Sequence, residues 1–295
     1  MKKSTSLSSK IFDICNYILF TVLTFICIYP FYYVIIYSVS DANRALTESV
    51  FLLPVGFSLD TYKSMFNLND IPHAFLVSLA RTLIATVITI VCSSFFAYLV
   101  TKNEMYFKKA VYRFVIITMY LNAGLIPWYL VMKMYGLKDN FLLYVIPGAV
   151  VAFYVILLKT YMEQLPAEIE ESAKIDGADY LTIFFKIIFP LSKPIIATVA
   201  VYSLVGQWNS WTDNFFLVSD SKLQTLQMIL YNYLNQASRL QNMSSQSINA
   251  GAIQAITPQS VKMCVTVIVV LPILFAYPYL QRYFVKGIMM GAVKG

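Results

Sequence analysis

Six long apolar runs recur along the chain, and the segments between them carry nearly all of its charge. A hydrocarbon core about 30 Å thick requires about 20 apolar residues in a helix, and each run meets that length. The second run begins near His73, because Pro72 suits a first helical turn. The pattern therefore predicts six transmembrane helices, over residues 14–40, 73–101, 111–133, 140–159, 194–217 and 261–282.

Composition supports this interpretation and excludes other classes of protein. Of the 295 residues, 59% are hydrophobic and only 13% are charged, whereas soluble domains average about 25% charged residues. Such a chain is neither disordered nor a disulfide scaffold, and six apolar runs leave little polar surface to cover them. The expected fold is an all-α polytopic membrane protein with a single transmembrane domain over residues 1–295.

Cysteine, histidine and basic residues exclude further kinds of site. The four cysteines are dispersed among the apolar runs without a Cys-x-x-Cys pair, and the chain has one histidine. These features predict buried free thiols rather than a metal site or a disulfide framework. The net charge is +7, but the lysines and arginines form no run with interleaved aromatic residues. We therefore expect no nucleic-acid partner.

Basic residues are distributed unequally between the two sides of the predicted spans. The termini and the connections after the second and fourth spans hold 14 lysines and arginines, and the opposite side holds seven. Because basic residues favour the cytoplasmic side, both termini are expected to be cytoplasmic. Lysines precede the first run as in a signal peptide, but this run is too long for one. It is interpreted as a retained span with a kink near Pro30.

Two long loops lie on the predicted outer side, over about residues 41–72 and 218–260. Loops of this length are usually functional or mobile, so the second is expected to dock an external protein, with a simple connector as the alternative. It opens with a stretch that predicts an amphipathic helix. The apolar face of that helix carries Leu223, Leu226, Leu230, Tyr233 and Leu234.

The loop over residues 160–193 is the only predicted cytoplasmic loop that is long enough to fold, and it is the most highly charged segment. Pro166 suits a first helical turn, and the three glutamates that follow favour the positive end of a helix dipole. Gly177 is a typical C-terminal stop. A second helix is expected over residues 179–189, ending before Pro190. The prediction is a helix-turn-helix against the inner membrane surface.

One face of the first helix in this loop is narrow and consists mainly of small side chains. Another backbone could approach such a face closely. The residues that share it at helical spacing are Ile169, Ser172, Ala173 and Asp176.

The same segment resembles a known family. The sequence ESAKIDGA over residues 171–178, followed by Ile187 and Phe189-Pro190, resembles the EAA loop of ABC-importer permeases. This chain has Ser172 where the family pattern has alanine, and Phe189 where it has leucine. The segments GQWNSW at 206–211 and YPYLQRYFVKGIMMGAVKG at 277–295 resemble the maltose-type carbohydrate permeases, specifically the LplC/YtcP-like branch. The resemblance covers essentially the whole chain.

This resemblance implies the fold of a type I ABC importer permease whose EAA helix inserts into a groove on a cytoplasmic ATPase. It implies a second homologous permease subunit, two ATPase subunits, an extracytoplasmic sugar-binding protein, and oligosaccharides or polysaccharide fragments as substrate. The chain has no GxxxxGK[ST] pattern, so it is not expected to be an enzyme or to hold a cofactor, and ATP and Mg belong to the partner ATPase. The implied coupling residues are Glu171 as a polar anchor, Ser172, Ala173, Asp176 and Gly177 at the turn.

Evidence for substrate contacts is weaker. At about 1.5 Å per residue, residues 208–213 lie roughly 21 to 29 Å along the fifth span, in its outer half. Indole rings stack on sugars and Asn or Asp accepts hydroxyl hydrogen bonds, but tryptophan also gathers at membrane interfaces regardless of substrate. Arg81 is interpreted as a residue near a span end or paired within the bundle. The candidate pathway residues are Trp208, Asn209, Trp211, Asp213, Asn122 and Tyr120, with Trp128 beside them.

Two other classes of function compete with this interpretation. A stand-alone secondary transporter or channel would show intramembrane ionisable residues and internal repeats, whereas Arg81 is the only candidate and no repeat is evident. A membrane enzyme would require a cluster of acids, bases or nucleophiles at the membrane face. The sequence contains neither HExxH nor GxSxG.

Overall fold

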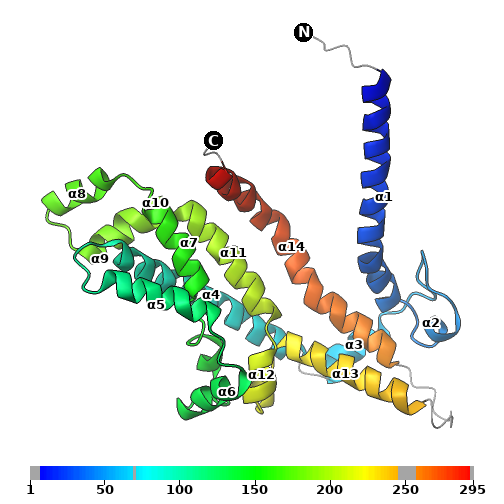
Figure 1. The fold of residues 1–295 in the computed structure, drawn as a ribbon. Coiled ribbons are helices and arrows are strands. Elements are labelled where there is room, and N and C mark those ends of the chain that lie inside the picture. The colour runs from blue at the N-terminus through cyan, green and yellow to red at the C-terminus, as the bar shows by residue number, and fades with distance from the viewer. Residues whose placement is uncertain (1–6, 69–70, 245–256, 293–295) are drawn as a thin grey trace. The chain divides into compact units, whose positions relative to one another are not determined.

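The computed structural model describes residues 7–68, 71–244 and 257–292, and every regular element within them is helical (Figure 1). The chain divides into two compact units, each described by itself. Unit 1 is Met1–Asp70 with Asn232–Leu271, and unit 2 is Ile71–Tyr231 with Pro272–Gly295. The expectation of an all-α fold is confirmed.

Three of the described helices are long and apolar enough to cross a membrane: Ser9–Ser38, Ile71–Thr101 and Pro258–Phe275. A fourth candidate is the pair Tyr180–Leu191 and Lys193–Asn209, which is bent by 82°. The third and fourth predicted spans contain only shorter apolar helices. The described helices thus include three or four candidate spans, and the six predicted crossings stay a prediction.

Unit 1 contains a short apolar core at the end of its first helix. Its elements are α1 (Leu7–Ser38), α2 (Arg44–Thr47), α3 (Asp60–Leu68), most of α13 (Leu226–Ser244) and the beginning of α14 (Pro258–Ala292). Ile36 and Tyr37 at the end of α1 pack with Ala45 and Val50. The helix α13 begins within the stretch that predicted an amphipathic helix.

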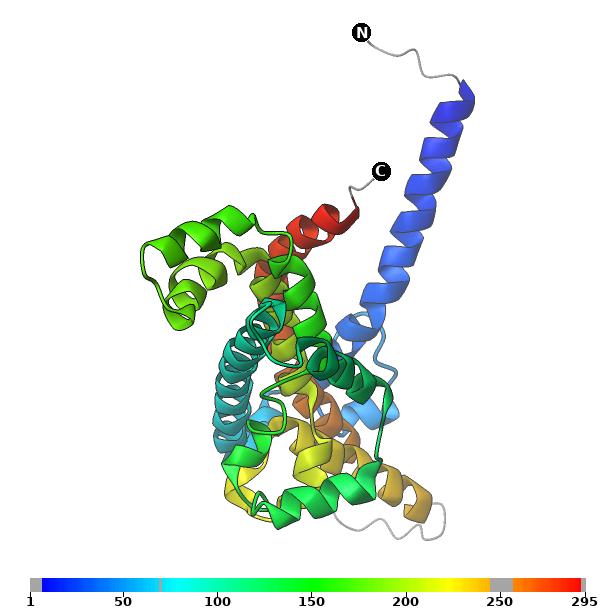
Figure 2. The same cartoon turned by 60° about the vertical axis from the view of Figure 1, so that its left-hand side comes forward.

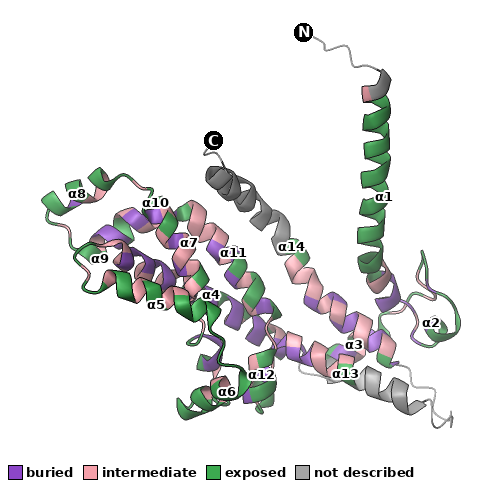
Figure 3. Cartoon of the chain, viewed as in Figure 1, coloured by how far each residue is buried: buried purple, intermediate pink, exposed green. Residues whose placement is uncertain are grey.

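Most of α1 is exposed along its length, as Figure 3 shows. Apolar side chains exposed in this way are what a span presents to lipid. Cys15 and Cys27 lie on this exposed helix, whereas Cys264 is buried. The expectation of buried thiols was therefore wrong for Cys15 and Cys27, because the described residues bury only the last turns of α1. Cys92 is partly buried.

Unit 2 contains the elements that position the candidate sites. The elements α8 to α10 lie at one of its ends, and α6 and α12 lie at the other (Figures 1 and 2). In chain order its elements are α4 (Ile71–Thr101), α5 (Lys108–Tyr120), α6 (Leu125–Met134), η1 (Phe141–Tyr144), α7 (Ala152–Met162), α8 (Ala167–Ile175), α9 (Tyr180–Ile183), η2 (Phe184–Ile188), α10 (Phe189–Leu191), α11 (Lys193–Asn209), α12 (Thr212–Leu217) and η3 (Ser221–Leu223), followed by the first turns of α13 and the last part of α14.

Small buried polar residues on α4 join it to its neighbours. Thr89 donates a 2.7 Å hydrogen bond to the carbonyl oxygen of Gly148, and Ser203 of α11 donates a 3.2 Å bond to Thr86. Ser93 donates to the carbonyl oxygen of Ala149 at 3.3 Å. Short polar side chains let helices approach closely and hydrogen-bond across the interface in an apolar environment. Unit 2 is thus built around α4.

The third predicted span is broken between α5 and α6. Gly124 has φ +84°, a conformation that disfavours other residues. Asn122 stabilises the turn, because its side-chain oxygen accepts a 2.9 Å hydrogen bond from the Gly124 amide. An Asx turn of this kind competes with helical bonding, so the apolar run cannot continue as one helix.

The fourth and fifth predicted spans are also interrupted. The short helix η1 precedes a non-helical segment that contains Pro147 and Gly148, and α7 begins only at Ala152. The helix α11 ends at Asn209, and α12 begins at Thr212. Both breaks leave backbone groups that side chains of unit 2 satisfy, as the Ser93 bond already shows.

Candidate functional site

The helix predicted to meet an ATPase, α8, begins and ends where the sequence indicates. Pro166 precedes it, and Glu168 and Glu170 lie in its first turn. At its end Gly177 has φ +82°, with 3.0 Å bonds from the Gly177 amide to the Lys174 carbonyl and from the Ala178 amide to the Ala173 carbonyl. This pair of bonds is a Schellman motif, which requires a left-handed residue and therefore favours glycine.

The predicted coupling residues divide between the two sides of α8. Ala173 is buried in the same apolar cluster as Ile183 and Phe184, so its small side chain allows α8 to approach this chain's own core. The other four predicted residues are exposed. They are Glu171, Ser172, Asp176 and Gly177.

A cluster of four charged residues fastens α8 to the end of α4, and we call it the charge cluster. Lys102, directly after α4, forms an ion pair with Glu170 of α8, and Lys174 lies 3.6 Å from Glu170 and 3.3 Å from Glu104. Burial lowers the pKa of Lys102 despite the attraction of Glu170. Burial also acts to lower the pKa of Lys174, but the hydrogen bond and charge of Glu104 outweigh it, so this pKa is raised.

Sequence reasoning missed this arrangement. Glu170 was interpreted only as an acid near a helix N-terminus, and Lys102 only as one of the basic residues on the inner side. The spacing of Glu170 and Lys174 is a recognisable i, i+4 signal. Lys102 and Glu170 are 68 positions apart, so no local signal predicts their pairing.

Aromatic rings hold the second part of the loop to α4. Phe184 is fully buried, with its ring centroid 5.2 Å from that of Phe95 and 5.4 Å from that of Tyr98. Asp179 caps α9 by accepting a 3.1 Å bond from the Thr182 amide, and hydrogen bonds from Thr182 lower the pKa of Asp179. The helical path then passes through the π-helical η2 and α10 as far as Leu191.

The expectation that this second helix ends before Pro190 was therefore wrong. Pro190 lies within the first two residues of α10, where a missing amide hydrogen is tolerated. The chain bends by 82° only after α10, at the junction with α11.

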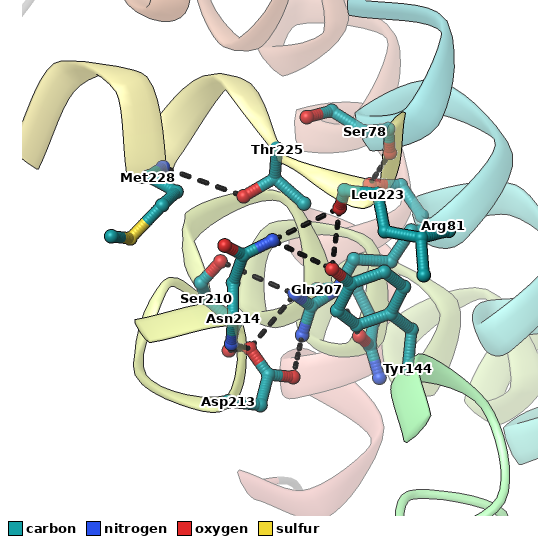
Figure 4. A network of polar contacts seen from close by, with 11 residues as sticks. Ser78, Arg81, Tyr144, Gln207, Ser210, Asp213, Asn214, Leu223, Thr225 and Met228 are labelled. Carbon is teal, nitrogen blue, oxygen red and sulfur yellow. Dashed lines mark hydrogen bonds and ion pairs between the residues drawn. The ribbon is translucent and has the colours of Figure 1, made fainter. Parts of the chain in front are cut away.

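At the other end of unit 2, Arg81 of α4 forms a buried ion pair across the break between α11 and α12 (Figure 4). Its two terminal nitrogens donate to the two carboxylate oxygens of Asp213 at 3.0 and 2.5 Å. Its Nε donates to Gln207 at 3.2 Å, and its terminal nitrogen Nη1 also donates to the carbonyl oxygen of Ser210 at 3.4 Å. The guanidinium carbon lies 4.4 Å from the centre of the Tyr144 ring. The interpretation of Arg81 as a residue paired within the bundle agrees with this geometry.

A second set of bonds continues the network behind this pair. Asn214 is buried and donates to the Tyr144 hydroxyl at 2.6 Å and to the Leu223 carbonyl at 3.0 Å. The Tyr144 hydroxyl donates to the same carbonyl at 2.6 Å. These bonds tie η1, α12 and η3 together around the Arg81–Asp213 pair.

The ion pair forms part of the wall of a cavity of about 290 Å³, which we call the Arg81 cavity. The positive and negative charges of the pair cancel, and several of the other lining residues carry a hydroxyl or amide side chain. Its lining residues are Arg81, Thr89, Trp128, Leu143, Tyr144, Pro147, Gly148, Val151, Tyr154, Ser203, Gly206, Gln207, Ser210 and Asp213.

The structure does not gather the predicted pathway residues on one wall. Asp213 lines the Arg81 cavity, but Arg81 occupies both of its carboxylate oxygens. Trp208 is buried against Phe75, with ring centroids 6.0 Å apart. Trp211 stacks on Tyr231 at 4.2 Å.

Trp128, named beside these candidates, also lines the Arg81 cavity, whereas the remaining candidates lie elsewhere. Asn209 accepts a 3.1 Å hydrogen bond from Gln227. Tyr120 is exposed, and Asn122 holds the turn between α5 and α6. Gln207 and Ser210, which line the cavity, stand within the same GQWNSW segment that sequence reasoning singled out. Gln207 directly precedes the residues it chose, and Ser210 lies between two of them.

This all-helical chain, with apolar helices of membrane-spanning length and a short helix anchored at one end, has the features of a membrane transport subunit. Residues 90–290 match the family model of the binding-protein-dependent transport system inner membrane component. The chain belongs to this family. It is a multi-pass inner-membrane permease subunit of an ABC transporter and not a catalytic subunit.

Individual relatives extend the match to the full length. The chain is 34% identical to the polygalacturonan/rhamnogalacturonan transport system permease protein YtcP of Bacillus subtilis, over 98% of this chain and 100% of the relative. It is 36% identical to protein LplC of the same organism, over 98% and 96% of the two chains. A chain of the crystal structure of a bacterial ABC transporter involved in the import of the acidic polysaccharide alginate matches with a TM-score of 0.84 and 26% identity, covering 95% of this chain and 99% of that one.

Proposed function

We propose that the chain is one of two homologous permease subunits in an ATP-driven importer of oligosaccharides or polysaccharide fragments. An extracytoplasmic sugar-binding protein delivers the substrate, and two ATPase subunits bind ATP and Mg and supply the energy. Two similar proteins support the substrate class, since one is named for polygalacturonan and rhamnogalacturonan and the other is involved in the import of alginate. Both match over nearly the whole of this chain.

The observation that carries the coupling role is the two-sided environment of α8. Its inner side holds buried Ala173 and the Glu170 ion pair, and its outer side exposes Glu171, Ser172 and Asp176. A helix anchored in this way moves with the membrane helices, whereas a flexible loop would absorb the displacement. Glu171 is the polar anchor to the ATPase in this proposal, and Gly177 supports the turn.

The proposed topology has six crossings and cytoplasmic termini. The crossings are α1, α4, α5 with α6, η1 with α7, α11 with α12, and α14, with residues 160–193 inside and residues 218–260 outside. Irregular backbone at membrane depth is tolerated where protein groups satisfy it or where it lines a cavity. The Asn122 turn and the Ser93 bonds supply such groups.

The substrate pathway in this proposal runs past the Arg81 cavity. A neutral wall rich in hydroxyl and amide groups suits a sugar ring, which exchanges hydrogen bonds in both directions. Gln207, Ser210 and Tyr154 are the cavity residues best suited to this contact. Asp213 contributes by holding Arg81 and the break between α11 and α12 in place.

Affinity purification of the tagged chain in mild detergent, from its native host at endogenous expression, tests the assembly. The expected result is one similar permease and two copies of a P-loop ATPase for each copy of this chain. The same complex in proteoliposomes should take up oligogalacturonides only with ATP inside and a loaded binding protein outside. Recovery of the chain alone or as a homodimer in several detergents would contradict the proposal and favour a stand-alone carrier.

A further inference from the structure

The charge cluster contains a shielded ion pair, a solvated pair, and a third contact at 3.6 Å between Lys174 and Glu170 that joins them. The side chains of Lys102 and Glu170 are 12% and 16% exposed, whereas those of Lys174 and Glu104 are 38% and 59% exposed. A solvated pair between flexible side chains contributes little to stability. A shielded pair resists separation, because each charge would lose its partner without regaining full hydration. The Lys102–Glu170 pair is therefore the stronger link.

Two residues of α4 and the segment directly after it hold Glu170 from one side. Tyr98 and Lys102 are four residues apart and share a face, and the Lys102 ammonium lies 4.0 Å from the centre of the Tyr98 ring. The Tyr98 hydroxyl donates a 3.5 Å hydrogen bond to Glu170. Glu170 thus contacts a charge and a hydroxyl that are both fixed to the last turn of α4.

A second attachment lies one turn back along α4. Phe184 packs against Phe95 and Tyr98, so the loop from α8 to η2 is fastened to α4 at two separate points. The covalent connections of this loop to α7 and α11 are not continuous helix. A non-helical turn precedes α8, and the 82° bend separates α10 from α11. A displacement of α8 is therefore passed to α4 through direct side-chain contacts.

We propose that Lys102 and Glu170 are positioning residues that transmit the displacement of α8 to α4 when the ATPase subunits close. The inference rests on the proposed function, because it needs an ATPase that moves α8. The helix α4 carries Arg81 and Thr89 of the cavity wall. The ion pair thus connects the ATPase contact to the substrate cavity through a single rigid helix.

The test uses the purified complex in proteoliposomes and measures uptake and ATP hydrolysis together. Lys102→Met keeps the aliphatic stem without the charge, Glu170→Gln keeps the shape, and Lys102→Arg keeps the charge. Glu168→Gln is the matched control, since Glu168 is an exposed acid in the same first turn with no ion pair among the described residues. We expect Lys102→Met and Glu170→Gln each to lower uptake per ATP hydrolysed by about 2- to 30-fold, as network mutations commonly do.

The ion pair between Lys102 and Glu170 also predicts how the two substitutions combine. The double variant Lys102→Met/Glu170→Gln should lose no more than the worse single variant, because no unpaired charge remains. Lys102→Arg and Glu168→Gln should retain the wild-type ratio. A role in folding alone would lower assembly, uptake and hydrolysis in parallel and leave the ratio unchanged.

Unchanged ratios in both single variants, or additive losses in the double variant, would overturn the inference while leaving the importer established. A parallel loss of assembly and both activities, at constant ratio in the surviving complex, would overturn it as well. A wild-type complex without ATP-driven uptake would overturn the proposed function itself, and this inference with it.

Discussion

Replacing Asp213 with asparagine removes the counter-charge of Arg81 and nearly preserves the shape of the side chain. The Arg81 side chain is 3% exposed and that of Asp213 is 14% exposed. Removing one partner of a buried ion pair typically costs about 3–5 kcal/mol, since the other charge is left uncompensated. Arg81 retains Gln207, the Ser210 carbonyl and the Tyr144 ring. We therefore expect the lower end, a loss of about 3 kcal/mol in the free energy of unfolding.

This loss is measured by reversible unfolding in mixed micelles that contain an increasing fraction of a denaturing detergent. The double variant Arg81→Gln/Asp213→Asn should recover much of it, because no orphaned charge remains. Glu163→Gln is the control, since Glu163 is 44% exposed in its 2.7 Å pair with Lys159, and such pairs contribute less than about 1 kcal/mol. An Asp213→Asn variant as stable as this control, or a double variant less stable than the single, would refute the reasoning.

Three further predictions follow from other parts of unit 2. Gly177→Ala should lower the free energy of unfolding by about 1–2 kcal/mol, because alanine is strained at φ +82°. Gly206→Ala is the control and should not destabilise the protein, since a Cβ atom added there has no neighbour within 4 Å. Glu171→Lys should leave insertion and assembly intact but lower uptake per ATP hydrolysed in proteoliposomes; a normal ratio would remove Glu171 from the coupling contact. Hydrogen bonds from the backbone amides of Ser219 and Asp220 lower the pKa of Asp139 below its ordinary value of 3.8. The ionised Asp139 therefore stabilises the fold fully above pH 3.8, and this contribution is lost as the pH falls through the lower pKa of the folded state. The hydrogen-exchange protection factor of the Ser219 amide should drop in that range, and Asp139→Asn should abolish the dependence on pH.

Features set by local sequence could be predicted well. The helix α8 was predictable because Pro166, the acids of its first turn and Gly177 each act within a few residues. The helix α4 was predictable because one apolar run of sufficient length is uninterrupted by a turn-forming residue. In both cases the local preference and the final structure agree.

The breaks within the apolar runs were not predictable in the same way. Lipid selects apolar side chains whether or not the backbone beneath them is continuous, so hydropathy gives no signal at Asn122 or Ser210. The Asn122-to-Gly124 turn was the readable exception, since asparagine and glycine are turn formers. The Arg81–Asp213 and Lys102–Glu170 pairs depend on tertiary packing, because their members are 132 and 68 positions apart in the sequence.

The Arg81–Asp213 pair also limits what this subunit contributes to recognition of a charged substrate. Arg81 is the basic residue that lines the cavity, and its terminal nitrogens are already committed to Asp213 and Ser210. A carboxylate on a uronate would have to displace Asp213, which would leave an unpaired acid in a shielded site. On the proposed function, the cavity therefore recognises the hydroxyl groups that neutral and acidic sugars share. The partner permease or the external binding protein, and not the Arg81 cavity of this chain, then distinguishes acidic from neutral sugars.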